Sequence, residues 1–168
     1  MIVRAERPED REASIRVEHK AFGSDVETRI VEAVHDEEGS FALVAEDGGE
    51  ILGHVQMARA HVGEAEVLSL GPIGVLPRRQ GRGIGRALVE AALEEAHARG
   101  ERAVILLGDP ALYPRFGFVP ASRFGLRNPF AGVTEAGFEI AEEDFMIAPL
   151  DERGHDLHGE VRWHAAFG

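Results

Sequence analysis

The spacing of apolar residues along this chain of 168 residues predicts a strand and two helices in its first forty positions. Residues 2–6 alternate weakly between apolar and polar, which is typical of a short strand. Pro8 suits the first turn of a helix, and Ala13 and Val17 then recur at the four-residue spacing of one helix face. A second helix is expected to begin after Asp25, a good N-cap, and to stop near Gly39.

The middle of the chain predicts three strands in succession. The apolar segments 41–47 and 51–62 flank a Gly-Gly pair, which is typical of a β-hairpin. A third strand is expected over residues 65–75, broken at Gly71-Pro72. Proline has no amide proton to donate, so this strand should bulge or separate from a neighbouring strand at that point.

The remaining pattern predicts a long helix, a central strand and further short elements. The helix is expected over residues 83–99 and ends at Gly100, a good residue for the position after a helix. Residues 102–109 form the most apolar strand and should lie in the middle of the sheet. Residues 110–116 should form a short helix or turn capped by Asp109, and residues 117–121 and 138–150 the last strands. The order indicates one α/β (α+β layered) structure with a mixed sheet.

Composition adds limits to this picture. The chain has the length of one domain, so residues 1–168 are interpreted as a single domain with a substantial core. The formal net charge of −12 argues against general nucleic-acid binding, because phosphate contacts need a basic surface. The absence of cysteine excludes disulfides and thiol catalysis. The first residues are charged and no apolar run approaches about 20 residues, so neither a signal peptide nor a membrane span is expected. A cytoplasmic protein is the interpretation that fits.

One segment departs from the acidic background. The stretch "RRQGRGIGRAL", residues 78–88, holds three glycines and four arginines immediately before and within the start of the long helix. Glycines let successive backbone N–H groups converge, and a helix N-terminus adds unpaired N–H groups and a positive dipole end. Together they predict a site for a phosphate or diphosphate.

Two well-known phosphate-binding patterns do not fit this loop. The dinucleotide pattern G-x-G-x-x-G fails because Arg86 stands where the third glycine belongs. The nucleoside-triphosphate loop fails because no lysine followed by serine or threonine is present in the loop. The pattern Q-x-x-G-x-G of residues 80–85 does fit. It resembles the coenzyme A diphosphate loop of the GCN5-related N-acetyltransferase (GNAT) superfamily, and "LGPIGVLP", "LYPRFGF" and "GEVRWHAAF" resemble its YhbS-like branch.

The resemblance implies a fold and a set of site residues. It implies a mixed, mostly antiparallel central sheet of about seven strands flanked by helices, with a split between the fourth and fifth strands. It implies acetyl-CoA as cosubstrate and direct attack by an amine in a ternary complex. The cofactor-binding residues that it implies are Ile73, Gly74, Val75, Gln80, Gly81, Arg82, Gly83, Ile84, Gly85 and Arg86.

The resemblance also implies a catalytic residue. Tyr113, the only tyrosine of the chain, is placed by it beside the thioester sulfur as general acid. A phenol with pKa about 10 stays protonated at pH 7 and can give a proton to a thiolate. The alternative is a core aromatic residue with its hydroxyl at the surface. The general base stays open among Ser69, Glu66, His54 and Asp109, and a water relay is the favoured hypothesis.

Two functions of different kinds follow. The first is an acetyl-CoA-dependent N-acetyltransferase that acts on a small-molecule or protein amine, as a monomer or homodimer. The second is a non-catalytic coenzyme A or nucleotide sensor, which would not need Tyr113. The eight histidines form no compact metal-ligand pattern, so no metal site is expected.

Overall fold

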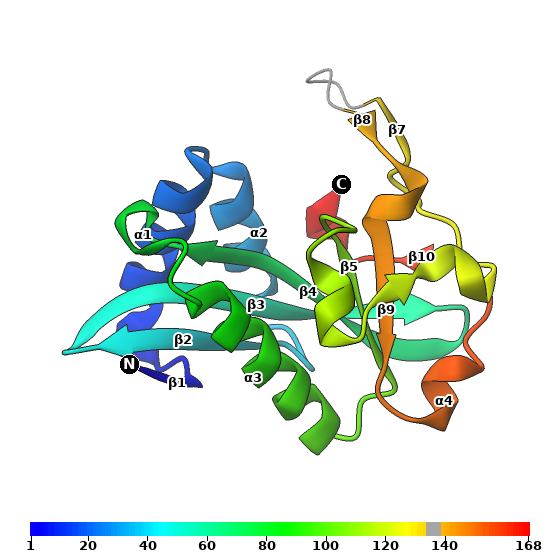
Figure 1. Cartoon of the computed structure of the whole chain (residues 1–168), viewed down its shortest axis with the longest axis horizontal. Coiled ribbons are helices and arrows are strands. Elements are labelled where there is room, and N and C mark those ends of the chain that lie inside the picture. The colour runs from blue at the N-terminus through cyan, green and yellow to red at the C-terminus, as the bar shows by residue number, and fades with distance from the viewer. Residues whose placement is uncertain (134–138) are drawn as a thin grey trace. The chain divides into compact units, whose positions relative to one another are not determined.

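The computed structural model describes residues 1–133 and 139–168, and it shows helices packed on an open β-sheet (Figure 1). The strands and helices are β1 (Ile2–Ala5), α1 (Arg11–Phe22), α2 (Val26–Val34), β2 (Phe41–Asp47), β3 (Glu50–Val62), β4 (Ala65–Val75), α3 (Ile84–Ala98), β5 (Ala103–Leu107), β6 (Val119–Pro120), β7 (Gly132–Val133), β8 (Glu139–Ile140), β9 (Phe145–Pro149), α4 (Glu152–His155) and β10 (Val161–Arg162). Short 3₁₀ turns connect several of them, at Pro8–Asp10, Pro77–Arg79, Tyr113–Phe116, Ala121–Phe124, Glu142–Asp144 and Ala165–Phe167.

The main sheet is mixed and mostly antiparallel, as expected from the resemblance. Within the described residues it has eight strands, hydrogen-bonded in the order β1-β2-β3-β4-β5-β9-β6, with β10 paired to β3. Only β4 and β5 run parallel among the strand pairs described, and they pair at Leu68 with Val104 and at Ser69 with Ile105. Both pairs come before Gly71-Pro72, where the sequence predicts that these strands separate.

The chain forms two compact units, which share β3, β4 and α3. The first unit contains residues 1–59, 70–95 and 164–168. The second unit contains residues 60–69 and 96–163. The expected diphosphate loop and the end of β4 therefore belong to the first unit, and Tyr113 belongs to the second.

In the first unit, helices pack on both faces of the strands. Figure 1 shows α3 in front of the strands of this unit and α1 and α2 behind them. Gly53 of β3 leaves room for α3, because a Cβ atom there would lie 2.9 Å from Leu88 and 3.0 Å from Ile84. The β2–β3 hairpin turns at Gly48 and Gly49, whose φ angles of 57° and 82° fit the left-handed turn that the Gly-Gly pair predicts.

The second unit has its own apolar core. Ile105 of β5 and Ile147 of β9 are opposite each other in an antiparallel pair and are fully buried. Phe145 packs edge-on against Trp163, with ring centroids 5.1 Å apart. The buried position of β5 between β4 and β9 confirms the prediction that residues 102–109 contain a central strand.

Several predicted elements differ from the observed ones. Residues 65–75 form one unbroken strand, so Pro72 does not interrupt β4 as expected. The second helix ends at Val34 and not near Gly39, because the chain turns at Glu37 and Ser40 through local hydrogen bonds. The segment 117–121 contributes only Val119–Pro120. Of the segment 138–150, Phe138 lies outside the described residues, and the rest divides between β8, paired with β7, and β9.

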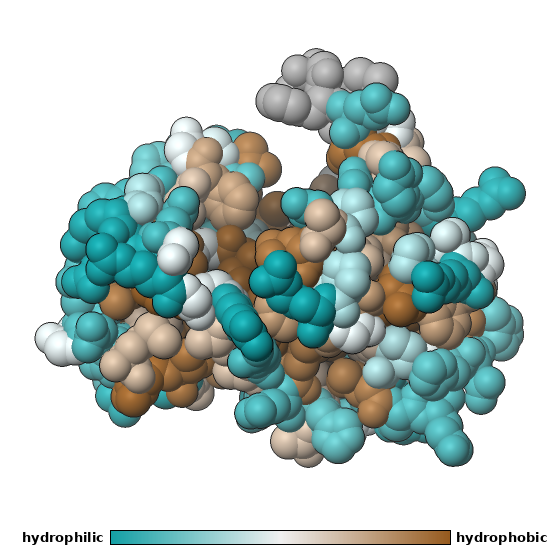
Figure 2. Space-filling model, viewed as in Figure 1, coloured by the Kyte–Doolittle hydropathy of each residue, from teal (hydrophilic) through white to brown (hydrophobic). Residues whose placement is uncertain are grey.

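The exposed surface is mainly hydrophilic. Figure 2 shows charged and polar residues over much of the viewed face, with smaller apolar patches between them. Phe22 and Val26 are exposed where α1 leads into α2, at 46% and 58%. None of the helices in the described part of the chain is long and apolar enough to cross a membrane.

Replacing Asp10 with asparagine is expected to lower the free energy of unfolding at pH 7 by about 1–3 kcal/mol. Asp10 accepts hydrogen bonds from Arg4 Nη1 and Nη2 at 2.6 and 3.0 Å and from the Arg7 amide at 2.8 Å. The Arg4 hydrogen bonds lower the pKa of Asp10 below its ordinary 3.8. This stabilisation is therefore complete above pH 4 and is lost as the pH falls through the lowered pKa.

Urea unfolding of Asp10→Asn and the native protein at pH 7 and at pH 3 measures this effect. The difference between the two proteins should shrink at pH 3. Glu9→Gln, one residue away on the exposed surface, serves as control and should leave the unfolding free energy unchanged. An equal difference at both pH values would contradict the assigned role of the Asp10 carboxylate.

Candidate functional site

The expected diphosphate loop connects β4 to α3 within the first unit. After Val75 the chain makes the 3₁₀ turn Pro77–Arg79, and α3 begins at Ile84. The side chain of Gln80 donates a hydrogen bond from Nε2 to the Val75 carbonyl at 3.0 Å. This bond holds the loop against the end of the strand. It gives Gln80 a structural role in the Q-x-x-G-x-G pattern.

The loop glycines hold backbone conformations that favour glycine. Gly81 and Gly83 have φ angles of 76° and 83°, in the region that residues with a Cβ rarely adopt. A Cβ atom on either glycine would find no protein atom within 4 Å, so the backbone here is open. The first N–H groups of α3 have no partner inside the helix. Open backbone and free helix N–H groups fit the diphosphate of coenzyme A.

The arginines of the loop differ in how much positive charge they leave available. Arg78 forms an ion pair with Glu50, and Arg86 pairs with Glu90 one helical turn away at 2.9 Å. Arg79 and Arg82 form no ion pair among the described residues. The positive charge beside the glycines is therefore smaller than four unpaired arginines would give, and Arg82 is the residue within the predicted loop 80–86 that keeps it.

The last residues of β4 belong to the first unit, as the loop of residues 80–86 does. Ile73, Gly74 and Val75 lie in its last three positions. A Cβ atom on Gly74 would lie 2.7 Å from Glu18 Oε2 and 3.0 Å from the Ala21 Cβ, both on α1. Glycine at position 74 thus allows α1 to approach the strand backbone. The Glu18 side chain on α1 places a carboxylate oxygen beside Gly74.

Tyr113 lies in the second unit, at the start of the 3₁₀ turn that follows β5. Its ring packs against Phe116 and edge-on against Phe118, with centroids 6.2 and 5.8 Å apart. Gly108 has no side chain to displace the ring, since a Cβ atom there would overlap it. Burial raises the pKa of the phenol above 10.0, and the nearby Asp109 carboxylate raises it further. The phenol is therefore fully protonated at neutral pH.

The four residues considered as general base have different surroundings in the structure. Asp109 caps the turn before Tyr113, because its carboxylate accepts from the Ala111 amide at 2.8 Å. Ser69 is fully buried. Glu66 lines a surface cleft of the second unit. His54 is fully buried in the first unit, and its Nδ1 lies 2.6 Å from Glu18 Oε1.

Glu18 is the residue that sequence reasoning missed. It is fully buried on α1 although it is a carboxylate, and burial raises its pKa while the hydrogen bond with His54 lowers it. The signal was present in the spacing. Ser14, Val17, Glu18 and Ala21 follow the i, i+3, i+4, i+7 pattern of one helix face, which places Glu18 on the buried side of α1.

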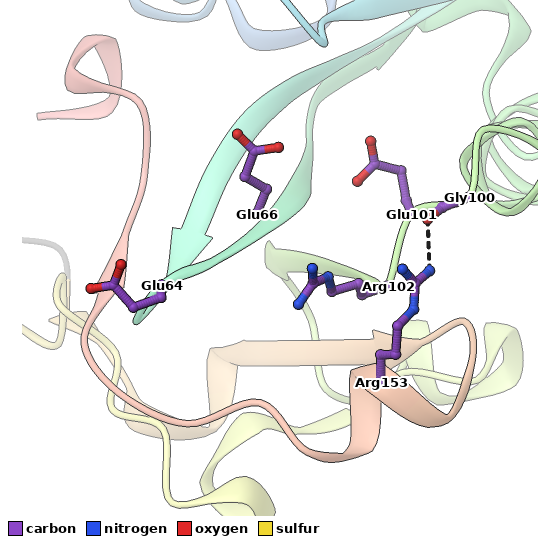
Figure 3. Close-up of a pocket in the computed structure, with 6 residues that line it drawn as sticks. All are labelled: Glu64, Glu66, Gly100, Glu101, Arg102 and Arg153. Atoms are coloured by element: carbon purple, nitrogen blue, oxygen red, sulfur yellow. Dashed lines mark hydrogen bonds between the residues drawn. The ribbon is translucent and has the colours of Figure 1, made fainter.

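A charged cleft of about 390 Å³ lies in the second unit (Figure 3). Its lining residues are Glu64, Glu66, Gly100, Glu101, Arg102 and Arg153. Arg153 donates to the Gly100 carbonyl at 2.8 Å across one side of the cleft. Its lining has three glutamates and two arginines, so it is not net positive and does not resemble a diphosphate site.

The described residues offer no metal site. No group of three or more histidine, aspartate or glutamate side chains in residues 1–133 and 139–168 could hold a metal ion.

Comparisons with known proteins identify the family of the chain. The profile of the acetyltransferase (GNAT) family matches residues 6–118. The N-acetyltransferase YhbS of Escherichia coli K12 is 34% identical over 174 residues, covering 99% of this chain and 98% of YhbS. The crystal structure of E. coli YhbS in complex with CoA superposes with a TM-score of 0.87 at 30% identity, covering 99% of this chain and 91% of that one.

A second solved structure is similar over the same span. It is a GNAT family acetyltransferase from Brucella melitensis in complex with acetyl-CoA, with a TM-score of 0.79 and 32% identity. It covers 99% of this chain and 97% of the Brucella protein. The sequence match and the shared fold extend over both compact units. The chain is therefore a member of the GNAT acetyltransferase family, in its YhbS-like branch.

Proposed function

We propose that the protein transfers the acetyl group of acetyl-CoA to an amine by direct attack in a ternary complex, with residues 1–168 acting as one N-acetyltransferase domain. The observation that carries the proposal is the open glycine backbone at Gly81 and Gly83, immediately before the N-terminus of α3. Relatives that cover the whole chain bind CoA and acetyl-CoA, and this supports the same cosubstrate here.

Each residue predicted for the site has a task in this reaction. Residues 80–86 bind the diphosphate through backbone N–H groups and the charge of Arg82. The amides of Ile73, Gly74 and Val75 hold the thioester carbonyl oxygen and stabilise the oxyanion that forms on attack. Acetyl-CoA supplies an activated acyl group and a thiolate leaving group. Tyr113 gives its phenolic proton to the departing sulfur.

The acceptor is an amine, and the net charge of −12 favours a cationic one, as a small molecule or on a protein. An alkyl amine with a pKa of about 10.4 is protonated in all but about one molecule in a thousand at pH 7. The reaction therefore needs a group that accepts the ammonium proton before attack.

Release of free thiol from acetyl-CoA in the presence of an amine panel tests the proposal. The expected result is thiol release that depends on one class of amine and equals the amount of acetylated amine formed, measured by mass spectrometry. Polyamines, amino sugars and peptides with a free N-terminus or lysine make a suitable panel. Tight binding of acetyl-CoA in calorimetry, without thiol release for any amine, would instead identify a coenzyme A sensor.

A further inference from the structure

Four ionisable side chains, three of them buried and His35 partly buried, form a chain through the first unit. His54 Nδ1 on β3 lies 2.6 Å from Glu18 Oε1 on α1, and both side chains are fully buried. Glu6, after β1, has a side chain only 3% exposed, and its Oε2 lies 2.7 Å from His35 Nε2. His35 Nδ1 lies 3.0 Å from Asp36, whose side chain is 83% exposed. The series thus leads from the fully buried Glu18 to solvent.

The contact between His54 and Glu6, in the middle of this chain, is about 1 Å longer than a hydrogen bond. His54 Nε2 and Glu6 Oε1 are 3.9 Å apart, against about 2.9 Å for a hydrogen bond. Neither atom has a hydrogen-bond partner elsewhere in the described residues. An unsatisfied buried polar atom destabilises the folded protein, so two that face each other call for an explanation beyond stability.

The inner end of the chain lies against β4. Glu18 Oε2 has no hydrogen-bond partner among the residues that the structure describes. It is the oxygen that a Cβ atom on Gly74 would approach to 2.7 Å. Gly74 is in the strand segment whose amides are assigned to the thioester carbonyl. The free carboxylate oxygen of Glu18 therefore faces the strand at which an amine must lose its proton.

We propose that Glu18 accepts the proton of the acceptor ammonium and that His54, Glu6 and His35 pass a proton on to solvent at Asp36. This proposal rests on the proposed acetyltransferase function and names its general base. It explains why a helix in contact with β4 carries a fully buried carboxylate. In this proposal Glu18 accepts the proton at its unpaired Oε2 beside Gly74, and the other three residues act through it.

The transfer moves one proton in and one proton out. The ammonium N–H bond breaks and Glu18 Oε2 binds the proton, while the proton on Glu18 Oε1 moves to His54 Nδ1 and the proton on His54 Nε2 moves to Glu6. Glu6 passes a proton to His35 Nε2, and His35 Nδ1 releases one towards Asp36 and water. Each of the four side chains ends with the charge it began with, and the two histidines are left as their other tautomers. No other bonds change, and the neutral amine is left to attack.

Other charges act on this chain from the elements packed against it. Glu27 on α2 raises the pKa of Glu18 through charge repulsion, although burial is the larger cause. At the solvent end, the hydrogen bond with His35 lowers the pKa of Asp36. Arg11 on α1, 3.5 Å from Asp36, lowers this pKa further and helps to keep the carboxylate ionised. An ionised acceptor at the exit favours proton movement outward.

The Glu18→Gln variant tests the base directly. Glutamine keeps the size of the side chain but cannot accept the proton, so kcat at pH 7 should fall by about 10²-fold while the Kd for CoA stays unchanged. The deficit should shrink as the pH rises towards about 10.4, because the amine then loses its proton without help. Glu12→Gln, on the exposed face of the same helix, is the matched control and should retain native kcat at every pH.

The Glu6→Gln variant tests the path beyond Glu18. It should lower kcat with the same pH dependence, since the proton can no longer pass from His54 to His35. If Glu18→Gln does not fold, Glu6→Gln carries the test. Native kcat in Glu18→Gln, or a loss in either variant that is equal at all pH values, overturns the proposal. Full activity in Glu6→Gln alone overturns the path and leaves Glu18 as the base. Absence of thiol release from the native protein with every amine refutes the proposed function itself.

Discussion

Replacing Tyr113 with phenylalanine is expected to lower kcat by about 10²–10⁴-fold, which is roughly 3–5 kcal/mol of activation barrier. The substitution keeps the ring that packs against Phe116 and Phe118 and removes only the hydroxyl. The proton is needed when the sulfur departs and not when acetyl-CoA binds. The loss should therefore fall on kcat, with the Kd for CoA unchanged.

The pH dependence of the same variant identifies the hydroxyl as an acid. Burial raises the pKa of Tyr113 above 10.0, so the phenol remains protonated at neutral pH and the native rate should fall only as the pH rises through that higher pKa. This alkaline fall should be missing in Tyr113→Phe. Steady-state kinetics with an identified acceptor, from pH 7 to pH 11, measure both effects. A variant that keeps most of its native kcat would show that Tyr113 is a packing residue and that the thiolate leaves without its proton.

Replacing Gly83 with valine is expected to weaken coenzyme A binding by about 10²-fold or more. Hydrogen bonds to a charged group contribute about 1.5–3 kcal/mol each, and a side chain at position 83 would keep the diphosphate from the loop N–H groups. No protein atom lies within 4 Å of a Cβ atom at this position, so the side chain would occupy space left for the ligand. Isothermal titration calorimetry with CoA measures the change.

The φ of 83° at Gly83 also makes valine strained, and the control must carry the same strain. Gly100, at the other end of α3, has a φ of 77° and equally open surroundings. Gly100→Val should therefore lose about 1–2 kcal/mol of stability, as Gly83→Val does, but bind CoA with native affinity. Unchanged affinity in a folded Gly83→Val variant would show that the diphosphate binds elsewhere.

The local elements could be predicted from the sequence because short-range physics determines them. The Gly-Gly turn at 48–49 requires positive φ angles, and the structure has them at both positions. The apolar face of α3 and the glycine that follows it set the bounds of that helix to within one residue at each end. The diphosphate loop at residues 80–86 is a prediction of the same local kind, since its glycines and the helix start that follows are contiguous in the chain.

Elements that depend on distant partners were harder to predict. Residues 161–162 pair with His61 and Val62 of β3, and no periodicity within two residues can indicate such a strand. Proline at position 72 led to the expectation of a broken strand. The missing amide matters only where a neighbouring strand needs it, and the β4–β5 pairs lie at Leu68 and Ser69, before Pro72. Strand pairing is a property of the whole sheet.

The sequence by itself determined the family and the cosubstrate, and it predicts residues 80–86 as the loop that binds it, because these rest on glycines and a helix start that are contiguous in the chain. Only the tertiary structure decided the surroundings of the ionisable groups. It buried Glu18 against His54, 36 positions away, and paired Arg78 with Glu50. The charge and pKa of such a group depend on burial and on neighbours brought from other elements, and those neighbours are set by packing and not by adjacent residues.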